Sequence, residues 1–216
     1  FLIFQLTVNV AAILVAFLGP FFGTNLPLTM TQLLWVNIVM DTLAAFAFSG
    51  EPALQRYMYE EPIPKGDSLI TGDMWSAILI DGIYMAFLSL FFLTSDFVSE
   101  LFVCDEIRCA DAEVNLVLLT AFFGFFVFIN NFNKFNARTE GLNLFEHITE
   151  NRSFIMVVVL IFFLQGTFTY IGGEVLRTIG LTFEEWVYVL VFAITIIPLD
   201  LLRKYLRNTF VGNPVA

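Results

Sequence analysis

The apolar segment at residues 28–49 carries an amide and a carboxylate that are suited to ion chemistry. Asn37 and Asp41 are four positions apart, so on an α-helix they lie on one face, a turn from each other. Asp41 is near the middle of the segment, where a carboxylate is most costly unless it is paired or hydrated. Hard cations such as Ca²⁺ take oxygen ligands of these kinds. The pair predicts part of an ion site, to which Thr42 would add a hydroxyl; the alternative is that both side chains only fix helix packing.

Two further amides are candidate ligands of the same site. Asn9 lies about midway along the first apolar segment, and Asn130 is the deepest of the asparagines that end the fourth. Interhelical hydrogen bonds from amides are also common in membrane bundles, so Asn9 taken alone favours packing. The other asparagines of the fourth segment are closer to an interface, and we expect them to cap or pack helices: Asn131, Asn133 and Asn136.

Two carboxylates outside this site are expected to be structural. Asp81 lies about two turns into the third apolar segment, where it would reach the interface or pair within the bundle. Asp200 is three and four positions before Arg203 and Lys204, a spacing that predicts an ion pair.

Several chemistries are excluded by the residue inventory. The chain has one histidine, His147, and two cysteines, Cys104 and Cys109. A haem held by paired histidines is impossible, and a Cys/His zinc site is not expected. No nucleophile with its base lies at membrane depth, and no glycine-rich phosphate loop is present, so we predict no catalytic or cofactor-binding residue. The two cysteines are either bridged in an oxidising compartment or free thiols.

Composition indicates the elements that must hold these residues. The chain is 58% hydrophobic and only 14% charged, whereas soluble domains carry about 25% charged residues. Six continuous apolar segments approach the ~20 residues that cross ~30 Å of hydrocarbon. They run roughly over 1–19, 28–49, 74–95, 114–133, 154–173 and 185–202. Continuous rather than alternating patterns exclude a barrel, so the predicted fold is all-α, a polytopic bundle of six transmembrane helices.

The distribution of charge predicts the orientation of the bundle. A net charge of −10 argues against nucleic acid as a partner. Six crossings put eight basic residues on one side and two, Arg108 and Arg177, on the other. The eight are Arg56, Lys65, Lys134, Arg138, Arg152, Arg203, Lys204 and Arg207. The positive-inside rule then places both chain ends in the cytoplasm. Because the chain begins inside an apolar run without methionine, we expect a fragment, with residues 1–211 as a membrane domain and 212–216 as a tail.

Three stretches resemble a known family. IFQLTVNVAAILVAFL at 3–18 and QLLWVNIVMDTL at 32–43 closely resemble the fifth and sixth transmembrane helices of P-type calcium-pumping ATPases. FNKFNAR at 132–138, with NLFEHI at 143–148, resembles the loop after that family's eighth helix. The likeness is greatest to plasma-membrane-type pumps and their bacterial relatives. It covers essentially the whole chain as helices five to ten; the Leu-Trp-Val-Asn-x-x-x-Asp core is specific, whereas the last two helices are generic.

The resemblance implies ligand roles for Asn37 and Asp41 in the sixth helix and for Asn9 in the fifth. Two-site pumps of the sarcoplasmic type have a glutamate, a threonine and a glutamate where this chain has Ala12, Met40 and Asn130. These departures remove oxygen ligands or charge from one of the two sites. The resemblance therefore implies a single Ca²⁺ per cycle.

The resemblance also implies parts outside this chain. A fourth-helix glutamate in a Pro-Glu-Gly-Leu motif would complete the site, and an aspartate in Asp-Lys-Thr-Gly would be phosphorylated. ATP and Mg²⁺ would act only through those absent domains, which would be partners of this chain together with Ca²⁺ and the lipid bilayer. The expected location is a plasma or bacterial inner membrane. The alternatives are a pump for H⁺, Na⁺ or Mn²⁺, and a stand-alone six-helix channel or structural membrane protein.

Overall fold

The computed structural model describes residues 1–24, 27–53, 59, 66, 68–104, 108–109, 114–139 and 141–210. Across these residues the chain is helical and contains no strand. Six helical stretches are long and apolar enough to cross a membrane: Leu2–Phe22, Met30–Ser49, Gly72–Thr94, Leu116–Arg138, Arg152–Ile171 and Phe183–Phe210. The predicted fold class, an all-α bundle of six transmembrane helices, is confirmed.

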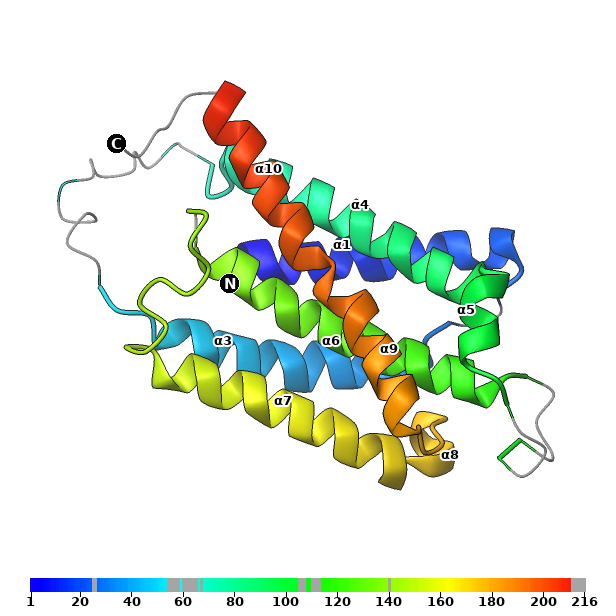
Figure 1. Cartoon of the computed structure of the whole chain (residues 1–216). Coiled ribbons are helices and arrows are strands. Elements are labelled where there is room, and N and C mark those ends of the chain that lie inside the picture. Colours follow the sequence, from blue (N-terminus) through cyan, green and yellow to red (C-terminus); the bar gives the residue numbers. More distant parts are fainter. Residues whose placement is uncertain are drawn as a thin grey trace.

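Several of these stretches are composed of more than one helical element (Figure 1). The elements are α1 (Leu2–Leu18), η1 (Gly19–Phe22), α2 (Met30–Leu34), η2 (Trp35–Met40), α3 (Asp41–Ser49), α4 (Gly72–Thr94), α5 (Asp96–Leu101), α6 (Leu116–Arg138), α7 (Arg152–Ile171), α8 (Gly173–Leu176), α9 (Phe183–Ile194) and α10 (Ile196–Phe210). The last stretch is divided at Thr195, because Pro198 has no N–H to donate to the carbonyl of Ile194.

Helix α6 forms the centre of the bundle. In Figure 1 it runs through the middle, with α9 and α10 crossing over it. In its most apolar window 78% of the residues are buried, against at most 56% in any other span. Phenylalanines fill the space around it, and Phe125 stacks on Phe92 of α4 with ring centroids 4.9 Å apart. This helix can therefore present polar side chains to an interior that lipid does not reach.

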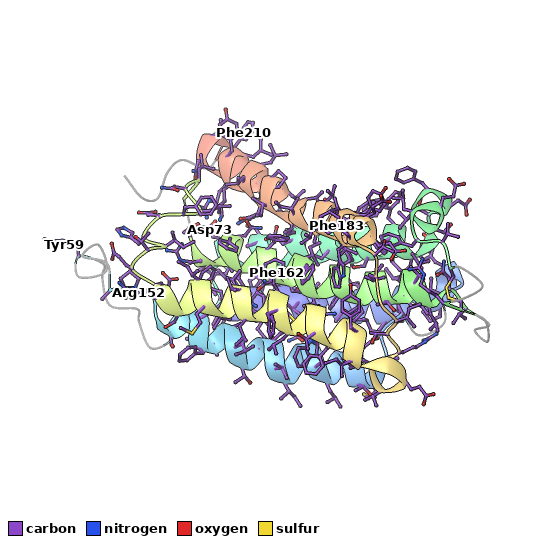
Figure 2. The ribbon with its side chains drawn as sticks, turned by 60° about the horizontal axis from the view of Figure 1, so that its bottom comes forward. Tyr59, Asp73, Arg152, Phe162, Phe183 and Phe210 are labelled. Atoms are coloured by element: carbon purple, nitrogen blue, oxygen red, sulfur yellow. A yellow bond between two sulfur atoms is a disulfide. The ribbon has the colours of Figure 1, made fainter. Side chains whose placement is uncertain are left out.

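The outside of the bundle is apolar. Phe183 and Phe210, at the two ends of the α9–α10 stretch, are 83% and 81% exposed (Figure 2). Exposed apolar side chains of this size cover most of the long helices, as expected for a surface that contacts lipid rather than water.

The close contact between α1 and α4 depends on Gly82. A Cβ atom at this position would lie 2.9 Å from Val10 Cγ1 and 3.3 Å from the carbonyl oxygen of Thr7. The β-branched valine is stiff and the carbonyl belongs to the backbone, so neither atom moves aside easily. Gly82 thus allows α4 to approach α1 closely.

We expect Gly82→Ala to destabilise the protein by about 1–3 kcal/mol through overpacking at this contact. The matched control is Gly166→Ala in α7, where a Cβ atom meets nothing within 4 Å. There alanine should be neutral or stabilise the helix by up to about 1 kcal/mol. Thermal unfolding of the purified protein in detergent checks both variants, and equal midpoints for the two would contradict the close-contact argument.

Two helices extend well beyond the bounds expected from the sequence: α10 runs to Phe210 instead of residue 202, and α6 also continues further. The fourth apolar segment was expected to end at residue 133, but α6 continues through Arg138. The added turn is polar in sequence, yet its side chains point inward: Lys134 and Asn136 are buried. Lys134 is therefore a buried helix residue and not a loop residue. It no longer counts among the basic residues that predict the orientation of the bundle. Arg56, Lys65 and the tail at 212–216 lie outside the described residues.

Candidate ion-binding site

The span that carries Asn37 and Asp41 is not a regular α-helix. It begins as α2, passes through the π-helical turn η2 over Trp35–Met40, and continues as α3 from Asp41. Bonds in a π turn join residues five apart, so positions four apart are no longer stacked as on an α-helix. Consistent with this, Asp41 is buried whereas Asn37 is exposed on the surface of the six-helix bundle. The expectation of one shared face assumed α-helical geometry, which this segment does not have.

Both ends of this span are fixed by hydrogen bonds. At its start Thr29 and Gln32 form a capping box, and the Gln32 amide donates to the carbonyl oxygen of Leu176 at 2.8 Å. At its end the Asn151 amide donates to the carbonyl oxygen of Ala47 at 3.0 Å. The helix is anchored on either side of the π turn, which positions Asp41 within the bundle.

Asp41 faces helix α1. Its side chain is 8% exposed, and Oδ2 accepts a hydrogen bond from Gln5 Nε2 at 3.3 Å. The other oxygen, Oδ1, is buried and has no hydrogen-bond partner among the described residues. One oxygen is thus oriented by α1, while the other is available to a ligand. Gln5 was not a candidate from sequence; the available signal was a polar side chain one turn before Asn9.

A lysine from the centre of the bundle lies near this carboxylate. Lys134 of α6 is fully buried, and its Nζ donates to Asn131 Oδ1 at 3.1 Å. The ammonium also lies 5.3 Å from the centroid of the Phe4 ring, a cation–π distance. The positive charge of Lys134 and the negative charge of Asp41 attract each other. Sequence reasoning missed this residue because lysine near the end of an apolar segment is typical of a solvated interface.

The remaining candidates are less closely associated with Asp41. Asn130 is fully buried; its Nδ2 donates to the Phe126 carbonyl at 2.6 Å, and its Oδ1 has no partner in the described part of the chain. It precedes Lys134 by one helical turn, so both lie on the same face of α6. Thr42 is exposed, and its hydroxyl donates to the Ile38 carbonyl at 2.5 Å.

Asn9 is half-buried. Within the described ranges, neither its side chain nor that of Asn37 makes a hydrogen bond. The ligand roles of all these residues stay predictions.

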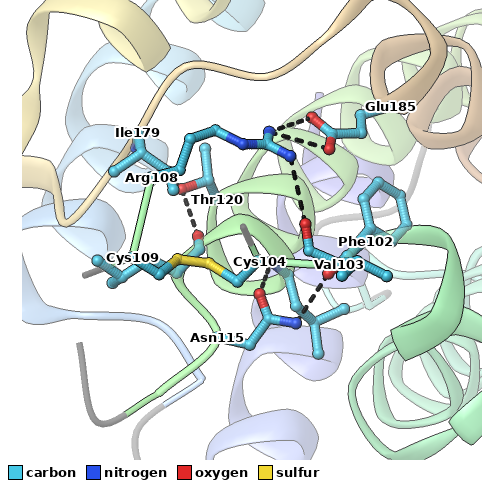
Figure 3. The surroundings of a disulfide bond; sticks show 11 residues. Phe102, Val103, Cys104, Arg108, Cys109, Asn115, Thr120, Ile179 and Glu185 are labelled. Atoms are coloured by element: carbon cyan, nitrogen blue, oxygen red, sulfur yellow. Dashed lines mark hydrogen bonds and ion pairs between the residues drawn. A yellow bond between two sulfur atoms is a disulfide. The ribbon is translucent and has the colours of Figure 1, made fainter. Parts of the chain in front are cut away.

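Away from the candidate ligands, a disulfide joins two cysteines that precede α6 in the chain (Figure 3). Cys104 and Cys109 are bridged, with Cα atoms 5.9 Å apart, which decides between the two alternatives left by the sequence. Between them Arg108 donates to both carboxylate oxygens of Glu185 at 3.0 and 3.1 Å, and to the carbonyl oxygen of Val103 at 3.2 Å. The ion pair joins Arg108, beside the bridged Cys109, to the start of α9.

Known proteins share this sequence pattern. Residues 25–206 match the family model for the C-terminus of cation transporting ATPases. The chain is 34% identical over 209 residues, 95% of its length, to a protein of Arabidopsis thaliana named calcium-transporting ATPase 8, plasma membrane-type. It is 37% identical over 207 residues, again 95%, to plasma membrane-type calcium-transporting ATPase 10 of Oryza sativa subsp. japonica. Calcium-transporting ATPase 2 of Schizosaccharomyces pombe is 32% identical over 214 residues, 97% of the chain.

These matches cover a small part of the relatives themselves. The aligned regions represent 19%, 20% and 16% of the three proteins, so the chain spans about one fifth of their length. The likeness therefore concerns the six-helix membrane portion.

Proposed function

This chain belongs to the family of cation-transporting ATPase C-terminal domains, and from that premise we propose that it is the membrane domain of an ATP-driven calcium pump. Residues 1–211 would supply ion ligands and a helical scaffold for export of Ca²⁺ from the cytoplasm, with 212–216 as a tail. The observation that carries the proposal is the buried carboxylate of Asp41 at membrane depth, one oxygen of which has no hydrogen-bond partner among the described residues. The names of the relatives support Ca²⁺ as the transported ion.

Asp41 is the proposed anionic ligand. A carboxylate oxygen without a donor is costly in a low-dielectric interior, and a bound cation removes that cost. The free Oδ1 of Asn130 is the best-placed neutral oxygen from α6, and Asn9 is the corresponding amide from α1. Asn37 lies on the outer surface of the six helices, where helices outside this chain would have to complete the ion cage. Thr42 would need to release the Ile38 carbonyl before it could bind an ion.

The π turn offers a way to couple this site to the rest of the pump. Conversion of η2 to an α turn would rotate Asn37 relative to Asp41 and change the oxygens that face the ion. The chain itself supplies no proposed catalytic residue. ATP and Mg²⁺ would act in other domains, whose phosphorylation would drive such a rearrangement and alternate access to the site.

The buried charge of Lys134 argues for a single transported ion. The Lys134 ammonium offsets the negative charge of Asp41. Two divalent ions would add four positive charges to a buried region that already holds this ammonium, an arrangement that low-dielectric surroundings disfavour strongly. We therefore propose one Ca²⁺ per cycle, as the substitutions at Ala12, Met40 and Asn130 also suggest.

The proposed setting is a plasma or bacterial inner membrane with both ends of the chain in the cytoplasm. Without the buried Lys134 and Lys204, six of the eight basic residues still remain on that side, against two on the other. Lipid surrounds the exposed apolar surface, and the missing helices and cytoplasmic domains would be the protein partners.

The test is transport by the full-length protein that contains this chain, reconstituted into proteoliposomes. ATP-dependent uptake of radioactive Ca²⁺ is expected, with one ion moved per ATP hydrolysed. A ratio of two would contradict the single-site proposal. ATP-driven uptake of Na⁺ or Mn²⁺ without Ca²⁺ uptake would mean that the transported ion is not calcium. The absence of any ATP-driven uptake would contradict the proposed pump function.

A further inference from the structure

A polar cavity lies near the start of α4 and beside α10. It has a volume of about 380 Å³ and lies between α1, α4, α6 and α10. Its polar lining comes mainly from α4 and α10 and includes Asp73, Asp81, Asn136, Asp200, Lys204 and Arg207. Of the described residues that line it, none belongs to the proposed ion site around Asp41. The cavity therefore needs an explanation of its own.

The basic side chains in this cavity are already bonded. Lys204 Nζ is 2.8 Å from Asp200 Oδ2 and donates to the carbonyl oxygens of Asn136 at 2.8 Å and Thr139 at 2.7 Å. Arg203 pairs with Asp200 Oδ1 at 2.6 Å and donates to Ser76 Oγ at 3.3 Å. The ion pair predicted from the spacing of Asp200 is confirmed. Asp200 is thereby held between two cations.

Asp81 differs from Asp200 in its surroundings. It is 2% exposed, and its Oδ1 is buried without a hydrogen-bond partner in the part of the chain that the structure describes. Asn136 Oδ1, in the same cavity, also lacks a donor there. The unsatisfied groups in this cavity thus include two acceptor oxygens that require a hydrogen.

Among the residues that the structure describes, the charged groups around Asp81 come from two helices. From α10, Asp200 repels its negative charge, while Arg203 and Lys204 attract it but are bonded to Asp200. At the mouth of the cavity, Asp73 of α4 and Arg207 of α10 are 3.7 Å apart.

The lining from α1 and α6 is uncharged: Ile3, Asn136, Ala137 and, just past α6, Thr139. A metal ion here would meet three cationic side chains, those of Arg203, Lys204 and Arg207, whereas a proton neutralises Asp81 without a further ligand.

We propose that this cavity is a proton-binding site in which the Asp81 carboxylate takes up one proton from water at this end of the bundle. A hydronium ion gives its proton to Asp81, leaving a neutral carboxylic acid and a water molecule. The acid then has a hydrogen to donate within the cavity, where Asn136 Oδ1 is an open acceptor. Asp200 keeps its ion pairs with Arg203 and Lys204.

The location of this site links it to helix α1. The residue after Asp81 is Gly82, which packs against the α1 backbone at Thr7. Thr7 lies between Gln5 and Asn9, the α1 residues next to or within the proposed ion site. Loss of the proton would place a negative charge beside the helix that holds Asp41 in position.

Infrared spectroscopy of the full-length protein tests the proposal, in a detergent without ester groups. At neutral pH we expect one carboxylic acid C=O band that shifts in D₂O and shifts again when aspartate is labelled with ¹³C. The band should be lost in Asp81→Asn and kept in Asp73→Asn, a matched change at the mouth of the same cavity. It should also disappear as the pH is raised in the wild-type protein.

The opposite outcomes would overturn the proposal. If the labelled wild-type protein shows no aspartic acid band at neutral pH, Asp81 is ionised and bound to water or to a cation. A band that persists in Asp81→Asn would assign the proton to another residue. Because labelling and pH titration use the wild-type protein, the test does not depend on the folding of a variant. It is also independent of Ca²⁺ transport.

Discussion

Asp41→Asn in the full-length protein is expected to abolish Ca²⁺-activated phosphorylation while expression stays near the wild-type level. Asparagine keeps the size of the side chain and its bond to Gln5 can be replaced, but the negative charge beside the ion is lost. Loss of residues that merely orient a metal ligand costs roughly 10- to 100-fold in affinity, so loss of the charged ligand should exceed about 100-fold. Phosphorylation from ATP, measured against free Ca²⁺ concentration, reports this change.

The control for this variant is Asp96→Asn. Asp96 is an exposed carboxylate in the first turn of α5, at the end of the bundle away from the start of α1 and the end of α10 (Figure 1). Its neutralisation changes the net charge by the same amount and should leave the Ca²⁺ dependence unchanged. If Asp41→Asn retained the wild-type Ca²⁺ affinity, the proposed ligand role of Asp41 would be wrong.

Lys134→Met is expected to raise the apparent Ca²⁺ affinity by about tenfold or more. Methionine fills the space of the lysine stem and removes the buried ammonium, which repels a divalent ion near Asp41. Two close unit charges interact by a few kcal/mol at an effective dielectric constant of about 20, and about 1.4 kcal/mol is a tenfold change in affinity. The measurement is the free Ca²⁺ concentration for half-maximal ATPase activity.

The same variant should be stabilised more strongly by Ca²⁺ than the wild type. Without the ammonium, the Asp41 charge is uncompensated when no ion is bound, so the melting temperature without Ca²⁺ should fall and its rise with Ca²⁺ should grow. Arg152→Met is the control, since Arg152 is exposed at the start of α7 (Figure 2) and its loss should change neither quantity. A lower Ca²⁺ affinity in Lys134→Met would instead mean that the ammonium holds Asp41 in a binding geometry.

The six spans were predictable because lipid imposes a simple length and polarity rule on the chain. An apolar run of about 20 residues must form a helix in hydrocarbon, whichever helices pack beside it. The rule fails where a helix continues inside protein instead of lipid. The end of α6 reads as an interface in sequence, but Lys134 and Asn136 find partners in the interior, so the helix extends to Arg138.

The sequence by itself also determined which carboxylate to examine, since Asp41 is the charged residue near the middle of its span. The tertiary structure decided what surrounds it. The π turn separates Asn37 from Asp41 in burial. The hydrogen bond from Gln5 and the charge of Lys134 come from residues 36 and 93 positions away in the chain. Periodicity describes neighbours on one helix, whereas the charge balance of a buried site depends on which helices pack together. That is why the sequence could point to a candidate ligand, whereas only the fold supplied its counter-charge.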